Sequence, residues 1–134
     1  MSLQNKRIYL VEDGVENRAI IQTLLERSGA KIAFDRWGTD TIKGLQLFAP
    51  VDIILLDLML PNKVTGYDVF DRIREIADFV DVPIVAVSAA DPSEAVPKTR
   101  AKGFAGFIAK PIDFELFPLQ IERILNHESV WQLR

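Results

Sequence analysis

The sequence predicts a doubly wound α/β fold, with a parallel sheet of five strands and five flanking helices. Short apolar runs rich in β-branched residues alternate along the chain with segments whose apolar residues recur at helical spacing. The central run, residues 51–57 (VDIILLD), is apolar without alternation, which is typical of a strand buried on both faces. Because crossovers between parallel strands are right-handed, few topologies remain, and we expect the strand order 2-1-3-4-5 of flavodoxin-like folds.

The expected strands are short apolar runs at residues 7–13, 30–35, 51–57, 82–89 and 104–110. The expected helices follow them at residues 15–29, 39–50, 67–78, 92–103 and 113–127. In the first helix, Ile20 and Leu24 share a face, and Gly29 suits its end. Pro50 ends the second helix.

Two prolines make the fourth and fifth helices the least regular. With Asp91 as N-cap, Pro92 would occupy the first helical position, but Pro97 would then break the helix from inside. With Ser93 as N-cap, Pro97 would lie in the first turn, where a missing N–H is harmless. We therefore expect a short or late fourth helix, and Pro118 predicts a similarly loosened start of the fifth.

Length and composition indicate one soluble domain. The chain has 134 residues, of which 49% are hydrophobic, so we expect a single domain over residues 1–134 with a core at about 6–126 and a short tail at 127–134. A net charge of −3 without a basic block argues against nucleic acid as a partner. The absence of cysteine excludes disulfides and thiolate metal sites. No apolar run approaches the roughly 18 residues of a membrane span, and the expected location is the cytoplasm.

Polar residues follow four of the expected strands. They are Glu12, Asp13, Asp57, Ser88 and Lys110. Taken singly, each has an ordinary structural explanation, such as a helix cap or a solvated lysine. Because the carboxyl ends of parallel strands meet at one edge of a sheet, however, we expect these side chains to converge. Clustered carboxylates repel one another unless a cation is bound, and oxygen ligands favour Mg²⁺, Ca²⁺ or Mn²⁺.

This set of residues resembles the receiver (CheY-like) domain of bacterial two-component response regulators. The resemblance rests on Glu12–Asp13, Asp57 with a proline four residues later, Ser88, and Lys110 followed by proline. It covers about residues 6–126 and implies that Asp57 accepts a phosphoryl group from the phosphohistidine of a histidine kinase or phosphotransfer protein. It implies a signalling switch that catalyses its own phosphoryl transfer and slow dephosphorylation, not an enzyme in the usual sense. Its output would be an unidentified protein or a homodimer through the fourth helix, fifth strand and fifth helix.

The resemblance also implies a metal site. Mg²⁺, or Mn²⁺ in its place, would be held by Asp13, the Asp57 side chain and the Met59 carbonyl, with Glu12 acting through water. This set suits Mg²⁺, which normally uses one or two carboxylates and keeps several waters. A nearby cation would also favour the ionised form of Asp57 that attack on phosphorus requires.

Further roles implied by the resemblance concern the phosphoryl group and the switch. Lys110 would contact one phosphoryl oxygen, and the Ser88 hydroxyl and Ala89 backbone would bind others. The bond between Lys110 and Pro111 would be cis. Phe107, three residues before the lysine, would turn from an outward to an inward position as Ser88 is drawn to the new oxygens.

Several residues depart from the family pattern. Glu12 replaces the commoner aspartate, and Phe107 lacks the hydroxyl of the commoner tyrosine. The loop at residues 61–66 is one residue longer than usual. Met59 and Ala90 are both apolar at positions that govern the entry of water, which favours a long phosphorylated lifetime.

Three alternative functions fit the sequence less well. A flavodoxin would carry a Gly/Ser/Thr-rich phosphate loop after the first strand, whereas this chain has the acidic EDGVENR at residues 12–18. A phosphatase of the haloacid dehalogenase type needs a second aspartate two residues after the nucleophile, where this chain has Met59. A receiver-like adaptor that is never phosphorylated would not need the complete set of acids, serine and lysine.

Overall fold

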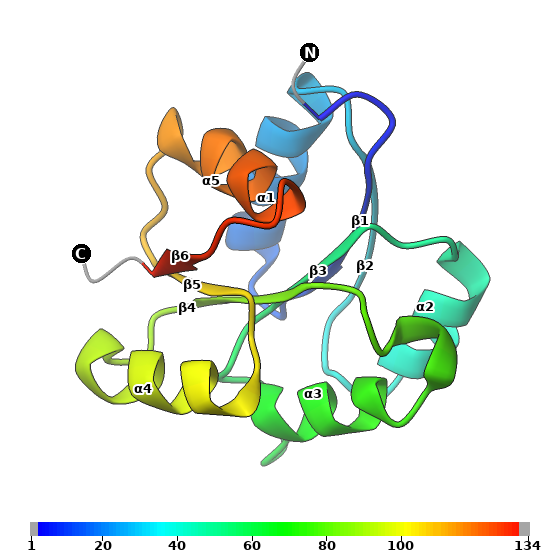
Figure 1. Cartoon of the computed structure of the whole chain (residues 1–134), viewed down its shortest axis with the longest axis vertical. Helices are drawn as coiled ribbons and strands as arrows, with labels where there is room; N and C mark the ends of the chain where they lie inside the picture. The colour runs from blue at the N-terminus through cyan, green and yellow to red at the C-terminus, as the bar shows by residue number, and fades with distance from the viewer. Residues whose placement is uncertain (1–2, 132–134) are drawn as a thin grey trace.

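A computed structural model, which describes residues 3–131, shows a parallel sheet of six strands with helices on both faces (Figure 1). The strands are β1 (Arg7–Val11), β2 (Lys31–Asp35), β3 (Ile53–Leu56), β4 (Ile84–Ser88), β5 (Gly106–Ala109) and β6 (Val130–Trp131). Their order is β2-β1-β3-β4-β5-β6, and every neighbouring pair is parallel. The predicted order of the first five strands is confirmed.

Helices cover the two faces of the sheet in different numbers. They are α1 (Val15–Arg27), α2 (Thr41–Phe48), α3 (Gly66–Arg74), α4 (Pro92–Lys102) and α5 (Leu116–Leu125), with a short 3₁₀ helix η1 (Ala77–Phe79) after α3. One face packs on α1 and α5, and the other on α2, α3 and α4 (Figure 1). Of the helices in the described part of the chain, none has the length and apolar character that crossing a membrane requires.

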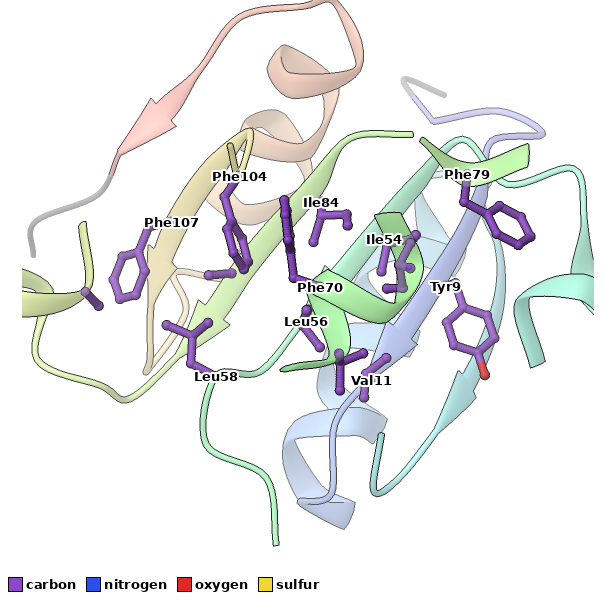
Figure 2. Close-up of a cluster of buried hydrophobic side chains, with 14 of the residues drawn as sticks. Tyr9, Val11, Ile54, Leu56, Leu58, Phe70, Phe79, Ile84, Phe104 and Phe107 are labelled. Carbon is purple, nitrogen blue, oxygen red and sulfur yellow. The ribbon is translucent and has the colours of Figure 1, made fainter. Parts of the chain in front are cut away.

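Alternate residues of each strand enter two separate apolar cores. In β1, Tyr9 and Val11 face α2–α4, whereas Ile8 and Leu10 face α1 and α5. All of β3 is completely buried, which accounts for its unbroken apolar sequence. Figure 2 shows the core on the α2–α4 side, where the rings of Phe70 and Phe104 stack at 4.5 Å between centroids.

The prediction of a short or late fourth helix was wrong. Helix α4 begins at Pro92, its N-cap Asp91 accepts a hydrogen bond from the Ser93 N–H at 3.0 Å, and Pro97 lies inside it. A proline removes the hydrogen bond to the carbonyl four residues earlier and crowds that carbonyl, here that of Ser93, which is an exposed residue. The buried face, which consists of Ala95, Val96 and Thr99, packs on the sheet and offsets the cost of about 3 kcal/mol.

In the C-terminal part of the chain, the late start of α5 agrees with the expectation and the tail after it does not. Pro118 lies in the first turn of α5, and that helix begins at Leu116, where the Asp113 carboxylate accepts the N–H groups of Glu115 and Leu116 at 2.9 and 3.0 Å. The expected tail at 127–134 contains β6, a strand of two residues, which is too short to show a periodic signal in the sequence. Residues 132–134 lie outside the described part of the chain.

Candidate functional site

The carboxyl ends of the central strands bring three acids together. Glu12 and Asp13 follow β1, and Asp57 follows β3. One carboxylate oxygen of each lies within 4.8 Å of those of the other two. Glu12 and Asp57 are buried and Asp13 is exposed. The convergence expected from a parallel sheet is therefore present, and it places oxygen donors around a small volume.

Lys110 follows β5 and supplies the cation at this cluster. Its Nζ lies 2.9 Å from Oδ2 of Asp57 and also forms an ion pair with Oε1 of Glu12. Burial alone lowers the pKa of Lys110, but the two carboxylates outweigh it and raise the pKa above its ordinary value. Burial raises the pKa of Glu12, opposed by the hydrogen bonds from Lys110 and the Gly14 N–H. Lys110 is therefore held as an ammonium between two buried carboxylates.

Asp57 is held on both oxygens. Oδ1 accepts the Met59 N–H at 3.0 Å, and Oδ2 accepts Lys110. The backbone N–H of Asp57 donates to the Val11 carbonyl at 3.1 Å, which continues the pairing of β3 with β1. A Cβ at Gly66 would lie 2.5 Å from the Asp57 carbonyl oxygen, so the close approach of α3 to this residue requires glycine.

The two neighbouring acids after β1 differ in availability. Glu12 is 2% exposed, and its second oxygen accepts the Gly14 N–H at 3.0 Å. Asp13 is exposed at the start of the loop into α1. Glu12 is thus already engaged by Lys110 and its own loop, which makes Asp13 the more accessible ligand for a cation.

Ser88 and Ala89 lie at the end of β4. The Ser88 side chain is completely buried, and its Oγ accepts the Ala90 N–H at 3.2 Å. Its carbonyl accepts the Lys110 N–H at 3.0 Å, so strand pairing places the serine beside the lysine. Ala89 is exposed at this edge.

Phe107 differs from its expected starting position. The resemblance implied an outward ring before phosphorylation, but Phe107 is completely buried in the core on the α2–α4 side (Figure 2). Phe107 shares this core with Ala95 and Val96 of α4, and Trp131 of β6 pairs with it and packs against the same core, so the ring is covered.

Two loops beside the site have unusual backbone geometry: the one after Lys110 and the one at residues 61–66. The bond from Lys110 to Pro111 is cis, and a second cis bond joins Ala49 to Pro50 at the opposite edge of the sheet, before β3. The loop at 61–66 turns through Asn62 and Lys63, which have φ angles of 60° and 63°, and Met59 bridges to Thr65 across it. The longer loop is therefore accommodated in a turn that leaves the Met59 side chain exposed.

Arg18 is a site residue that sequence reasoning missed. It is buried in α1, donates to the Glu12 carbonyl at 3.2 Å, and its guanidinium lies 4.5 Å from the centroid of the Phe34 ring. It holds the Glu12 carbonyl and thereby fixes the backbone just before Asp13. An arginine in a predicted helix carries no signal of burial, so only its proximity in sequence to Glu12 could have suggested this.

Comparisons with known proteins agree with this geometry. The family model of the response regulator receiver domain matches residues 8–122, and the chain belongs to that family. It is therefore a receiver domain of the kind used in two-component and phosphorelay signalling, a family of switches.

Individual relatives differ in how much of them the chain covers. It is 33% identical over 127 residues to the peroxide stress-activated histidine kinase mak1 of Schizosaccharomyces pombe. The alignment covers 91% of this chain but only 8% of the kinase. It is 29% identical over 121 residues to the polar-differentiation response regulator DivK of Brucella ovis, which aligns 90% of this chain and 97% of DivK.

Among solved structures, the receiver domain of the sensor histidine kinase PA1611 from Pseudomonas aeruginosa has a TM-score of 0.76 and 26% identity, with 92% of this chain and 96% of that chain covered. That structure is described with a magnesium ion coordinated in its active-site cleft.

Proposed function

We propose that residues 1–134 form one receiver domain that is switched by phosphorylation of Asp57, with a phosphohistidine of a histidine kinase or phosphotransfer protein as donor. The observation that carries the proposal is the placement of Asp57: a buried carboxylate at a strand end, 2.9 Å from the Lys110 ammonium and within 4.8 Å of two further acids. A receiver-like adaptor that is never phosphorylated would have no use for this arrangement.

The transfer needs little from the protein beyond charge and position. An oxygen of Asp57 attacks phosphorus and forms an O–P bond as the P–N bond to the donor histidine breaks, and the imidazole nitrogen keeps the electron pair and takes up a proton. Lys110 lies 2.9 Å from Asp57, where it can neutralise the oxygens of the transferring group. Ser88 and the Ala89 backbone, at the end of the adjacent strand, are the expected hydrogen-bonding partners of those oxygens.

The donor set fits a divalent cation. Three carboxylates and one ammonium leave two negative charges, which one Mg²⁺ or Mn²⁺ would balance, and the available ligands are hard oxygens. Asp13, Asp57 and the Met59 carbonyl would hold the ion, with Glu12 acting through water. Such an ion, when bound, supplies positive charge to the phosphoryl oxygens.

The surroundings of Asp57 are consistent with delivery of the phosphoryl group by a partner protein. They are also consistent with slow hydrolysis of the phosphorylated form. Asp57 is only 6% exposed, so the donor group must enter from the loop side of the sheet. Met59 and Ala90, which flank that approach, have no group that could activate water, and we expect a phosphorylated form with a long lifetime. The output partner, or a second copy of the chain, is expected at the surface of α4, β5 and α5.

The test is phosphorylation by acetyl phosphate with Mg²⁺, followed by intact mass. We expect a gain of one phosphoryl group that chelation of the metal prevents and that Asp57→Asn abolishes. The matched control is Asp52→Asn, which removes a carboxylate from the exposed segment just before the other end of β3. Undiminished phosphorylation of the Asp57→Asn protein would overturn the assignment.

A further inference from the structure

A sixth strand covers the edge of the sheet next to the switch residue. The chain returns from α5 and lays Val130 and Trp131 along β5, opposite Gly106 and Phe107 (Figure 1). The β5 edge, which a five-stranded sheet would leave open, is thereby closed. We call these two residues the β6 strap.

The β5 edge is shaped for the strap. A Cβ at residue 106 would lie 2.5 Å from the carbonyl oxygen of Val130, a distance that real Cβ atoms essentially never show. Only glycine lets the two backbones approach this closely. Gly106 therefore marks the strap as a specific contact of this chain.

Each residue of the strap enters a different core. Val130 is 7% exposed and packs with the core on the α1 and α5 side. Trp131 packs against the core on the α2–α4 side, which contains Phe107, and the Arg100 guanidinium of α4 lies 4.8 Å from the centroid of its ring. The strap thus closes over Phe107 and is held there by α4.

Helix α4 joins the strap to the acidic site. It begins after Asp91, three residues beyond Ser88, and Arg100 lies in its last turn. A change at the Ser88–Asp91 segment therefore acts on the same helix whose far end holds Trp131. The strap itself is only two residues long and lies at the sheet edge, where strand pairing is least protected and local opening costs least.

We propose that the β6 strap is a displaceable cover of the β5 edge: it is docked while Asp57 is unphosphorylated, and phosphorylation releases it. This inference rests on the proposed function. The new phosphoryl oxygens attract the Ser88 hydroxyl and the Ala89 N–H, and this displaces the start of α4. Because Arg100 lies on the same helix, its guanidinium then moves away from the Trp131 ring. Release uncovers Phe107 and the hydrogen-bonding edge of β5, which can then pair with a strand of a partner in place of β6.

Trp131 reports its own release. Trp37→Phe leaves Trp131 as the only tryptophan of the two in the chain. In this variant, acetyl phosphate and Mg²⁺ are added, intact mass measures the phosphorylated fraction, and fluorescence quenching and amide exchange follow Trp131. The rate of exchange through local opening is proportional to the population of the open state. We expect phosphorylation to raise the open population, and with it the exchange rate of the Trp131 backbone amide, about tenfold.

Two variants release the strap without phosphorylation. Gly106→Ala adds the Cβ that Val130 excludes, and Arg100→Gln removes the cation over the ring from an exposed position where folding is not at risk. Both are expected to expose Trp131 in the unphosphorylated protein. The matched control is Lys98→Gln, which removes one charge and one cation–π contact from the same helix, over the Tyr67 ring at 4.3 Å, and is expected to leave Trp131 shielded.

The outcomes separate the two claims. A mass that does not change under acetyl phosphate contradicts the proposed function and, with it, the release signal. A phosphorylated protein in which Trp131 stays as shielded as before overturns the strap alone. A Trp131 that responds equally to Lys98→Gln and Arg100→Gln also overturns it, because general loss of charge on α4 would then explain the effect.

Discussion

The acidic site and the β5–β6 edge belong to one sheet but are held by opposite kinds of interaction. At the acidic site, Glu12 and Asp57 are buried carboxylates that share the single ammonium of Lys110. At the β5–β6 edge, Val130 and Trp131 are held by apolar packing and a two-residue strand pair. The stability of the acidic site depends on the balance of a few buried charges. The stability of the β5–β6 edge depends on apolar contact area.

This difference determines how each region responds to change. Removing one partner of a buried ion pair leaves a charge that neither water nor protein solvates well, so the response is abrupt. Removing a small apolar contact at a sheet edge shifts a local opening equilibrium gradually, by an amount that follows the contact area lost. The acidic site is therefore suited to hold a reactive group in one geometry, and the edge is suited to change its population.

The largest expected effect is that of Lys110→Met. The variant leaves Glu12 and Asp57 buried and close together without their cation, and we expect the free energy of unfolding at pH 7 to fall by about 3–5 kcal/mol, measured by urea denaturation. Mg²⁺ should restore part of the loss, because it replaces the missing positive charge. The control Lys98→Met, on the surface of α4, is expected to change stability by less than about 0.5 kcal/mol. Equal effects of the two variants would mean that the ion pairs contribute nothing.

The pH dependence of the same pair of proteins sharpens this prediction. The raised pKa of Lys110 means that the folded state binds its proton more tightly than the unfolded state does. The resulting stabilisation is complete below the ordinary value of 10.5 and is lost as the pH rises through the raised pKa. The difference in unfolding free energy between the parent and Lys110→Met should therefore shrink above pH 10.5. Tyr9, whose pKa burial and Asp35 raise, is present in both proteins and cancels.

A smaller effect is expected for metal binding. Asp13→Asn should weaken Mg²⁺ binding by at least about tenfold, or ~1.4 kcal/mol, and Glu12→Gln by less. The reason is that Asp13 is exposed at the cluster, whereas Glu12 is engaged by Lys110 and the Gly14 N–H. Isothermal titration with MgCl₂ measures both constants. A larger loss for Glu12→Gln would reverse the ranking of the two acids.

How far the sequence predicts these two regions follows from the same contrast. The acidic site was predictable because polar residues after apolar strands must meet at the carboxyl edge of a parallel sheet. The β6 strap was not, because two residues carry no period and the gap beside Gly106 exists only in the folded chain. The prediction of a short or late fourth helix failed for another reason: packing of the buried face of α4 outweighs the local cost of Pro97. The burial of Arg18 likewise depends on Phe34, which is distant in sequence.

The smallest expected effect joins the two regions and is that of Ser88→Ala. The Ser88 hydroxyl is buried and accepts only the Ala90 N–H among the bonds described, so its loss should lower stability by about 1 kcal/mol. Asp57, Lys110 and the remaining acids are unchanged, so acetyl phosphate should still phosphorylate the variant, as intact mass would show. Trp131 should nevertheless remain shielded after phosphorylation, because the segment that leads into α4 has lost the hydroxyl through which the phosphoryl group acts on it. The comparison variant is Ser93→Ala, which removes an exposed hydroxyl from the first turn of α4 and should release Trp131 as the parent does. If Ser88→Ala releases Trp131 fully, the signal reaches α4 by another path, and the acidic site and the edge are coupled without this serine.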